Sequence, residues 1–411
     1  MSDNETNRNT RLAEAGSAPT AEVIRITDPA TDRYFTVDQS SHLSKEIVQN
    51  ATVMVVGAGA LGNEVLKNLA LLGIGRVFIV DFDVIEAANL SRSVLFRLSD
   101  TGRRKVDVAA EGLKALNPDV KVARFHGDIT TELGLGVVRR MDVVIGCLDN
   151  REARLWVNRA CWKVGKPWVD GAILEFDGVA RVFVPGNGAC YECTLTEADW
   201  KLLNVRYSCP QYARASIQLG KVPTTPTISS IVAAIQTQEA LKILHDIPVS
   251  SGKAFIFNGL TNDSYLTEYN QKSDCSSHFA LPEVLALPEC SASVTTAQEI
   301  LAAIRRISGD SAVVRLGHEL VIGLTCRACS RKDDIPVAPL FRLTEEDAKC
   351  LSCGRVREAV MSHFLTGAER FLGHTLSQLG IPPLDILTVQ NGSECWYFEL
   401  TGDEKEVFRF V

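Results

Sequence analysis

Several hallmarks of common protein classes are missing from this chain of 411 residues. No apolar run approaches the roughly 18 residues that a membrane-spanning helix needs, so we expect no membrane partner. The first residues, MSDNETNRNTRLAEAGSAPT, contain no apolar signal core, which predicts a cytoplasmic protein. Basic residues are not in excess, because 43 Lys and Arg face 50 Asp and Glu, a net charge of −7. Without a broad basic field to hold phosphates, no nucleic-acid partner is expected.

Cysteine, by contrast, is plentiful, with 12 residues. Three Cys-x-x-Cys pairs occur, and a further cysteine precedes a histidine at the same spacing. In a chain with no export signal, such pairs indicate metal ligation rather than a disulfide framework.

The order of the predicted strands and helices indicates an α/β fold. Residues 1–30 are polar and aperiodic and are expected to form a flexible tail. Within 31–280, apolar runs typical of buried strands alternate with segments of helical periodicity. This alternation predicts a Rossmann-like, doubly wound, mostly parallel sheet, with antiparallel strands added after residue 166. Predicted strands include 52–57, 76–83, 120–127 and 141–149, and predicted helices include 40–50, 105–116, 151–164 and 228–244.

Three later segments do not continue this alternation of strands and helices. Residues 194–226 lack periodicity, and we expect an irregular crossover loop of the kind that is usually functional or mobile. Residues 281–296 are expected to form a linker. Residues 297–411 are expected to form a separate α+β module with a helix at its start and strands at its end.

The first chemical motif is the loop Gly57-Ala58-Gly59-Ala60-Leu61-Gly62, between a predicted strand and a predicted helix. Its glycines allow a tight turn and a close backbone approach, and the helix N-terminus favours an anion. Asp81 follows the last glycine by 19 residues, about where a ribose-binding acid belongs. The pattern therefore indicates a nucleotide site, with a tight turn that binds nothing as the alternative.

A basic segment after the second strand favours ATP over a redox dinucleotide. It contains Arg92, Arg97, Arg103, Arg104 and Lys105. A triphosphate needs such charge and a redox Rossmann domain does not, although a solvated loop is the alternative for any single residue.

Together these motifs resemble the adenylation domain of the ubiquitin-activating enzymes and of the thiamine and molybdopterin sulfur-carrier adenylyltransferases, the ThiF–MoeB–HesA superfamily. The resemblance covers about residues 50–280 and implies ATP and Mg²⁺ as cofactors. The cofactor-binding residues that it implies are Gly57, Gly59, Ala60, Gly62, Asp81, Asp83, Asn89, Arg92, Lys105, Asp149 and Asn150. Asp149 would hold Mg²⁺. Arg92, Lys105 and Asp149 would also be catalytic, because a carboxylate attacking the α-phosphate builds negative charge that a metal and fixed cations stabilise.

The chain departs from the family pattern at two places. Ser93 stands where the family usually has Gln after the arginine. Many members also carry an N-terminal arginine that reaches into a partner subunit's site, and the corresponding segment here, 32–36, lacks it. Whether an arginine of residues 30–40 serves a partner stays open.

Two sets of ligands predict two structural Zn²⁺ sites. The first set is Cys190, Cys193, Cys275 and His278, in which His278 would replace the last thiolate of the resembled family. A Cys₃His shell is a common closed zinc geometry, and Cys290 is the reserve ligand. The second set, Cys326, Cys329, Cys350 and Cys353, has 20 residues between its pairs. This spacing matches the zinc-ribbon pattern and predicts a ribbon within the C-terminal module.

Cys209 is the candidate nucleophile. It lies in the expected crossover loop near Arg206 and Arg214, and nearby cations lower a thiol's pKa toward the reactive thiolate. The activating enzymes that the chain resembles place their thioester cysteine similarly, before a Pro/Thr-rich stretch such as 222–226. An inert cysteine is the alternative. Cys147 and Cys161 are expected in the core, as is Cys395 within the C-terminal module.

The leading hypothesis is an enzyme that adenylates the C-terminal glycine of a ubiquitin-like protein, forms a thioester at Cys209 and transfers the acyl group to a conjugating enzyme. By its position, the 297–411 module would dock that conjugating enzyme. A homodimer, from a bacterial pathway, is expected. The alternatives are a sulfur-carrier adenylyltransferase for thiamine, molybdopterin or cysteine synthesis, and an inactive scaffold subunit.

Overall fold

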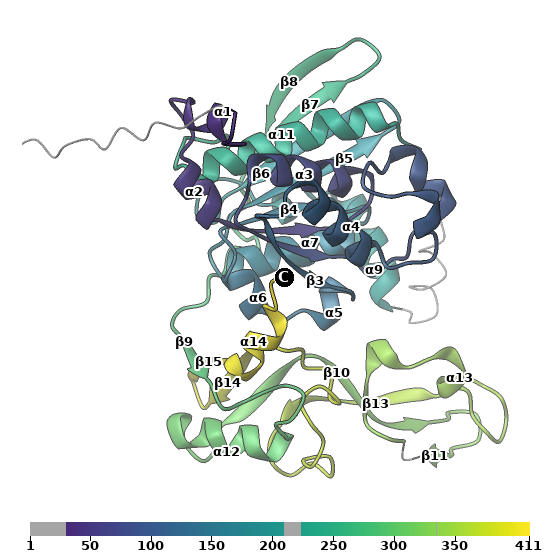
Figure 1. Ribbon diagram of the computed structural model, residues 1–411. Coiled ribbons are helices and arrows are strands. Elements are labelled where there is room, and N and C mark those ends of the chain that lie inside the picture. Colours follow the sequence, from purple (N-terminus) through teal and green to yellow (C-terminus); the bar gives the residue numbers. More distant parts are fainter. Residues whose placement is uncertain (1–29, 209–222, 334) are drawn as a thin grey trace, which may run out of the picture.

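The computed structural model describes residues 30–208, 223–333 and 335–411, so the expected tail lies almost wholly outside the described residues. Figure 1 shows a larger α/β domain, and a smaller module that contacts it through α14 (Glu404–Val407) and carries an arm at one side. The predicted α/β fold class, with a C-terminal module that contains a cysteine cluster, is confirmed.

An eight-stranded sheet forms the centre of the larger domain, in the order β3-β2-β1-β4-β5-β6-β7-β8. The five strands from β3 to β5 pair in parallel, and β6 to β8 continue the sheet antiparallel. The strands are β1 Thr52–Val56, β2 Arg76–Val80, β3 Lys121–Phe125, β4 Val143–Gly146, β5 Trp168–Leu174, β6 Asp177–Phe183, β7 Lys253–Asn258 and β8 Asp263–Glu268. The sequence therefore predicted correctly both the parallel half and the change to antiparallel pairing.

Both faces of the parallel strands are buried, which explains their continuous apolar runs. In β1, Val53 and Val55 belong to one core cluster, whereas Met54 and Val56 belong to another. The first cluster packs under α3 (Ala60–Leu72), α4 (Lys105–Leu116) and α11 (Pro226–Leu244). The second packs under α5 (Ile129–Glu132), α6 (Leu135–Arg139) and α7 (Arg151–Lys163). Of the short helices, α2 (Lys45–Asn50) adds Val48 to the first cluster and α8 (Tyr191–Thr194) adds Tyr191 to the second, whereas α1 (Phe35–Asp38) adds no residue to either.

The C-terminal module has a seven-stranded sheet with the central order β11-β10-β14-β15-β9, and β12 and β13 also pair with β10. Its elements are β9 Val284–Leu287, α12 Ala297–Ser308, β10 Val313–Thr325, β11 Lys332–Asp333, β12 Ala338–Pro339, α13 Glu345–Ala348, β13 Glu358–Leu365, β14 Ile386–Asn391 and β15 Glu394–Leu400. The long β10 continues into the arm and pairs there with β13 (Figure 1). The second cysteine set lies in this arm, between β10 and β13.

Three expectations differ from the structure. The segment 194–226, expected to be irregular, begins with helix α9 (Glu197–Ser208), whose sequence shows no apolar periodicity. The expected linker 281–296 contributes β9, which pairs in parallel with β15 and so belongs to the sheet of the module. Cys395, expected in the core, is exposed, because it lies near the start of β15.

A close interface joins the module to the larger domain. Glu399 of the module has a side chain that is 1% exposed, and it pairs with Arg139 at 2.6 Å and with Arg140. Leu384 is fully buried in the second core cluster of the larger domain, and its carbonyl accepts a hydrogen bond from Gly136 N at 2.8 Å. Among the described residues, every helix is too short or too polar to span a bilayer.

Candidate nucleotide site and metal clusters

The glycines of the loop between β1 and α3 fall into two groups. A Cβ at Gly57, which has φ +94°, would lie 2.3 Å from the carbonyl oxygen of Cys147. A Cβ at Gly62 would lie 1.9 Å from the carbonyl oxygen of Gly57. Close packing therefore requires both glycines. At Gly59, the N-cap of α3, no atom lies within 4 Å of an added Cβ, so the space beside the helix N-terminus is open to a ligand.

Asp81 lies just after β2 and holds this loop. Its Oδ2 accepts a hydrogen bond from Ala58 N at 2.6 Å, and its Oδ1 accepts one from Asp83 N at 2.7 Å. Burial raises the pKa of Asp81, against the opposing effects of Lys105 and of the two N–H donors. The residue predicted to hold ribose thus shapes the glycine loop directly.

The predicted phosphate-binding cations both follow β2 but differ in their surroundings. Lys105 is buried, and its ammonium group pairs with Asp83 at 2.6 Å. Arg92 ends a 3₁₀ turn (Ala87–Arg92) and donates to the carbonyl of Ala88 at 2.9 Å. Asn89 accepts from Glu86 N at 2.9 Å within the same turn. The structure thus places these side chains on one segment beside the glycine loop.

Asp149 is exposed between β4 and α7, at the same sheet edge as the glycine loop and Asp81. Because the carboxyl ends of parallel strands converge there, this is the edge at which doubly wound folds bind ligands. Asn150 caps α7 by accepting from Ala153 N at 2.8 Å, and its amide donates to Asp149 Oδ1 at 3.3 Å. An exposed carboxylate beside a phosphate site is a suitable ligand for Mg²⁺.

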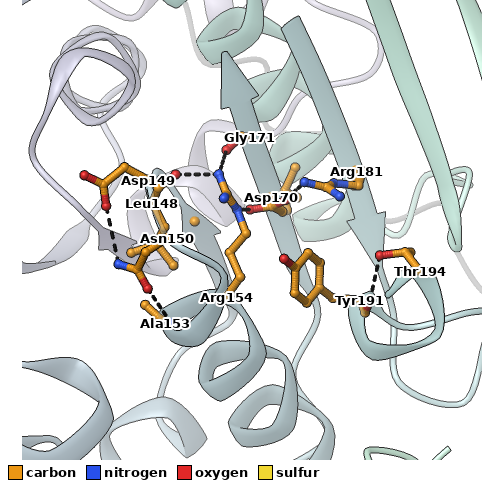
Figure 2. Close-up of polar contacts among 12 residues, drawn as sticks. Leu148, Asp149, Asn150, Ala153, Arg154, Asp170, Gly171, Arg181, Tyr191 and Thr194 are labelled. Atoms are coloured by element: carbon orange, nitrogen blue, oxygen red, sulfur yellow. Dashed lines mark hydrogen bonds and ion pairs between the residues drawn. The ribbon is translucent and has the colours of Figure 1, made fainter. Parts of the chain in front are cut away.

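Arg154, which the sequence reasoning missed, holds this region together. Figure 2 shows its guanidinium group between Leu148, which follows β4, and Asp170 and Gly171 of β5: it donates to the carbonyls of Leu148 and Gly171 and to Asp170 at 2.9 Å. Asp170 is fully buried and also pairs with Arg181 at 2.7 Å. No local signal in the sequence marked it, because α7 also carries Arg151, Arg159 and Lys163, and nothing in the helix distinguishes the arginine that is buried and paired.

The first metal-ligand set comes together although 81 positions separate its two pairs in sequence. Cys190, Cys193, Cys275 and His278 have ligand atoms within 4.8 Å of one another. The Sγ atoms of Cys190 and Cys275 are 3.5 Å apart, and Cys193 Sγ is 3.4 Å from His278 Nε2. These distances suit a zinc tetrahedron, whose S–S edge is about 3.8 Å. Cys290, the reserve ligand, lies in the apolar core of the C-terminal module instead.

His278 is well placed to act as the fourth ligand. Its ring stacks on Trp162 of α7 with the centroids 4.4 Å apart. Burial lowers the pKa of His278, which favours the neutral imidazole that metals bind. The set therefore connects α7, α8 and the segment after β8.

The second set forms a compact cluster in the arm. The Sγ atoms of Cys326 and Cys353 are 3.5 Å apart, and those of Cys329 and Cys350 are 3.6 Å apart. All four fit one tetrahedral ion. A shell of four thiolates leaves no open position, so such an ion would be structural.

The predicted nucleophile and the N-terminal segment 32–36 are not among the described residues of this site. Cys209 lies outside the described residues, as do all of residues 209–222. The segment 32–36 packs on its own domain, where Arg33 donates to the carbonyl of Leu116 at 3.2 Å and Tyr34 is buried.

Comparison with known proteins agrees with this arrangement. The ThiF family model matches residues 33–277, and the chain therefore belongs to the ThiF family, the adenylyltransferase superfamily that its motifs indicate. The sulfur carrier protein adenylyltransferase of Thermus thermophilus is 36% identical over 229 residues, which cover 54% of this chain and 80% of that protein. The SAMP-activating enzyme E1 of Haloferax volcanii is 32% identical over 244 residues, which cover 59% of this chain and 86% of that protein.

Longer relatives and a solved structure complete the comparison. The adenylyltransferase and sulfurtransferase MOCS3 of Bos taurus is 32% identical over 251 residues, and the match spans about half of that protein, 52% of its length. A crystal structure of E. coli MccB with MccA-N7isoASN has a TM-score of 0.51 at 24% identity, covering 60% of this chain and 75% of that one. The latter likeness supports the fold alone.

Proposed function

We propose that this protein activates a ubiquitin-like protein by adenylating its C-terminal glycine with ATP. The observation that carries the proposal is that the glycine loop, the Arg92–Lys105 segment and Asp149 follow the carboxyl ends of β1, β2 and β4, which are neighbouring parallel strands. The relatives named above are adenylyltransferases or activating enzymes, which supports the same chemistry.

In the first step, a carboxylate oxygen of the carrier's C-terminal glycine attacks the α-phosphorus of ATP, and pyrophosphate leaves with the electron pair of the broken P–O bond. The open N-terminus of α3 at Gly59 and the cations Arg92 and Lys105 stabilise the added negative charge. Mg²⁺, when bound by Asp149, neutralises further charge on the phosphates. Lys105 would exchange part of its pairing with Asp83 for the phosphates.

In the second step, the Cys209 thiolate attacks the carbonyl carbon of the acyl adenylate, and AMP leaves. The product is a thioester, which a conjugating-enzyme thiol then attacks, regenerating Cys209. The C-terminal module is the proposed docking part for that enzyme. We further propose a homodimer, two structural Zn²⁺ ions and a cytoplasmic location.

A second candidate is a sulfur-carrier adenylyltransferase that makes the same adenylate and transfers no acyl group to a conjugating enzyme. The specific observation in its favour is the Thermus thermophilus relative, of which this chain covers 80%.

Pyrophosphate exchange with a panel of ubiquitin-like and sulfur-carrier proteins tests the adenylation step. Wild type should exchange with its cognate carrier, and Asp149→Ala should lose exchange by at least 100-fold, because the carboxylate that would hold Mg²⁺ is removed. Normal exchange by Asp149→Ala would contradict the assigned metal role. No exchange by wild type with any carrier would contradict the proposed function.

The thioester step is tested with Cys209→Ala, and Cys395→Ala, which removes an exposed cysteine of the C-terminal module, is the matched control. Cys209→Ala should keep exchange but form no ATP-dependent, thiol-sensitive adduct with the carrier, whereas Cys395→Ala should form it normally. An adduct on Cys209→Ala would assign the acyl group to another cysteine. No thiol-sensitive adduct on wild type would favour the sulfur-carrier alternative.

A further inference from the structure

Asn63, in the first turn of α3, is a polar side chain that is fully buried beside the glycine loop. Its amide nitrogen donates to the carbonyl of Ala58 at 2.8 Å and to the carbonyl of Gly59 at 3.0 Å. Its Oδ1 accepts from Leu95 N at 3.0 Å. Each of these contacts joins Asn63 to a segment that the proposed site uses, and none joins it to apolar core.

The two carbonyl contacts fix the orientation of the loop's N–H groups. In a planar trans peptide, the N–H of one residue points opposite to the C=O of the residue before it. The Asn63 side chain holds the carbonyl of Ala58, and it shares the carbonyl of Gly59 with the main-chain N–H of Asn63, which donates to it at 2.9 Å. The N–H groups of Gly59 and Ala60 therefore point away from Asn63. First-turn amides have no partner within a helix, so these donors are available to an anion.

Asp81 fixes the same loop from the other side. It accepts from Ala58 N at 2.6 Å, while Asn63 binds the carbonyl of Ala58, so both peptide planes that flank this residue are held. An unsubstituted Gly59, with open space around its Cα, then lets a ligand approach the aligned donors.

The hydrogen bond from Leu95 N connects Asn63 to the segment that carries Arg92 as well. Leu95 follows the turn that carries Asn89 and Arg92 by three residues, and its side chain packs against Gly112 of α4. Asn63 therefore connects the phosphate-binding loop to the segment that supplies the cationic side chain.

We propose that Asn63 is a positioning residue for adenylation, which aligns the N–H groups of Gly59 and Ala60 toward the triphosphate and sets the distance of the Arg92 segment from them. This inference rests on the proposed function. It goes beyond the motif residues, because Asn63 itself is buried and acts on ATP only through the backbone groups that it holds.

The test compares Asn63→Asp, Asn63→Ser and Asn63→Ala. The Asp variant keeps the shape and the acceptor for Leu95 N but cannot donate to the two carbonyls when ionised, whereas the Ser hydroxyl can donate to one carbonyl. The Kd for a non-hydrolysable ATP analogue and the kcat and KM of pyrophosphate exchange are measured. We expect at least a tenfold weaker Kd and a higher KM for ATP in the Asp and Ala variants, partial rescue in the Ser variant, and an unchanged KM for the carrier.

Asn158→Ser is the matched control. Asn158 is also a fully buried helical asparagine with side-chain hydrogen bonds, to Ser277 Oγ and from Tyr191 N, each at 2.9 Å, but it lies away from the glycine loop. It should lower Tm without changing the Kd for the ATP analogue.

The outcomes separate the possible errors. An unchanged Kd in a folded Asn63→Asp or Asn63→Ser variant would overturn the positioning role, as would an equal loss of affinity in Asn158→Ser. If Asn63→Ala does not fold, the isosteric Asp variant and the Ser variant decide. Wild type that binds the analogue but exchanges with no carrier would overturn the proposed function, and the Kd comparison would still decide the role of Asn63.

Discussion

Removing the metal cluster in the arm should unfold only the arm. Around the four cysteines, at residues 326–333 and 345–357, the structure buries little apolar surface besides the cysteines themselves, since Leu351 is 82% exposed and Val356 is 54% exposed. The cohesion of this segment comes from the four thiolates and from the Arg357–Asp333 ion pair at 2.6 Å. Zinc binding to such shells supplies about 10–16 kcal/mol, which exceeds what so small a core can give.

Cys350→Ser should therefore remove one of two zinc ions and abolish hydrogen-exchange protection at residues 326–333 and 345–357, while residues 338–342 keep theirs, because β12 pairs with β10 and Arg342 donates to the carbonyl of Ser377. The core of the module should remain, because its apolar cluster, which includes Ile300, Val314 and Phe398, does not contain the four cysteines. Zinc content, exchange mass spectrometry and pyrophosphate exchange measure the three effects.

Cys395→Ser is the control, because this exposed cysteine lies in the same module outside both clusters. It should keep two zinc ions and full protection. Loss of protection at α12 or loss of adenylation in Cys350→Ser would refute the reasoning, since the arm would then support structure beyond itself. If the wild-type protein contained only one zinc ion per chain, one of the two cysteine clusters would not bind metal.

Two further predictions concern the glycine loop and the interface between the parts. Gly59→Ala should fold with wild-type stability, because its Cβ meets no atom within 4 Å, yet it should bind ATP at least tenfold more weakly. Gly62→Ala should instead lose about 3 kcal/mol of stability, because its Cβ would lie 1.9 Å from a backbone oxygen. Thermal unfolding and ATP titration measure both effects, and equal behaviour of the two variants would contradict this account. Burial raises the pKa of Asp385 from its usual 3.8 to about 6, although two backbone N–H donors and the charge of Lys163 act to lower it. Since the folded-state pKa of this acid is raised, its contribution to stability falls as pH rises from about 4 to about 6, by at most about 3 kcal/mol. Asp385→Asn should therefore be more stable than wild type at pH 8 and lose that advantage at pH 4, which chemical denaturation at both pH values checks; an equal advantage at both would exclude ionisation as the cause.

Local spacing in the sequence was enough to predict most of the α/β domain. Val53 to Val56 form an unbroken apolar run, which is what a strand buried on both faces requires, and helices with 3.6-residue periodicity follow it. The glycine spacing also predicted the turn after β1, because Gly62 meets the carbonyl of Gly57 within the same loop, although Gly57 itself meets the carbonyl of Cys147, which only the fold brings there. The Cys326–Cys353 cluster was predictable for the same reason, since two short pairs at ribbon spacing need only one hairpin to meet.

Contacts between residues far apart in the chain needed the tertiary structure. His278, rather than Cys290, completes the first cluster because β8 returns the chain to α7, whereas Cys290 enters the core of the next module. β9 looked like a linker because its apolar run, Val284–Leu287, is only four residues long and lies between Pro282 and Pro288, and only its pairing with β15 makes it a strand.

The buried polar residues show the same division. The sequence by itself determined the residue types of the glycine loop, the cations and the cysteine pairs, because short-range spacing encodes them. Only the fold decided that Asn63 and Arg154 are buried and which carbonyls they bind, because a polar side chain in a helix has the same local pattern whether it faces solvent or the interior. The free energy that distinguishes the two cases comes from partners in other strands and loops, whose distance is set by the packing of the whole sheet.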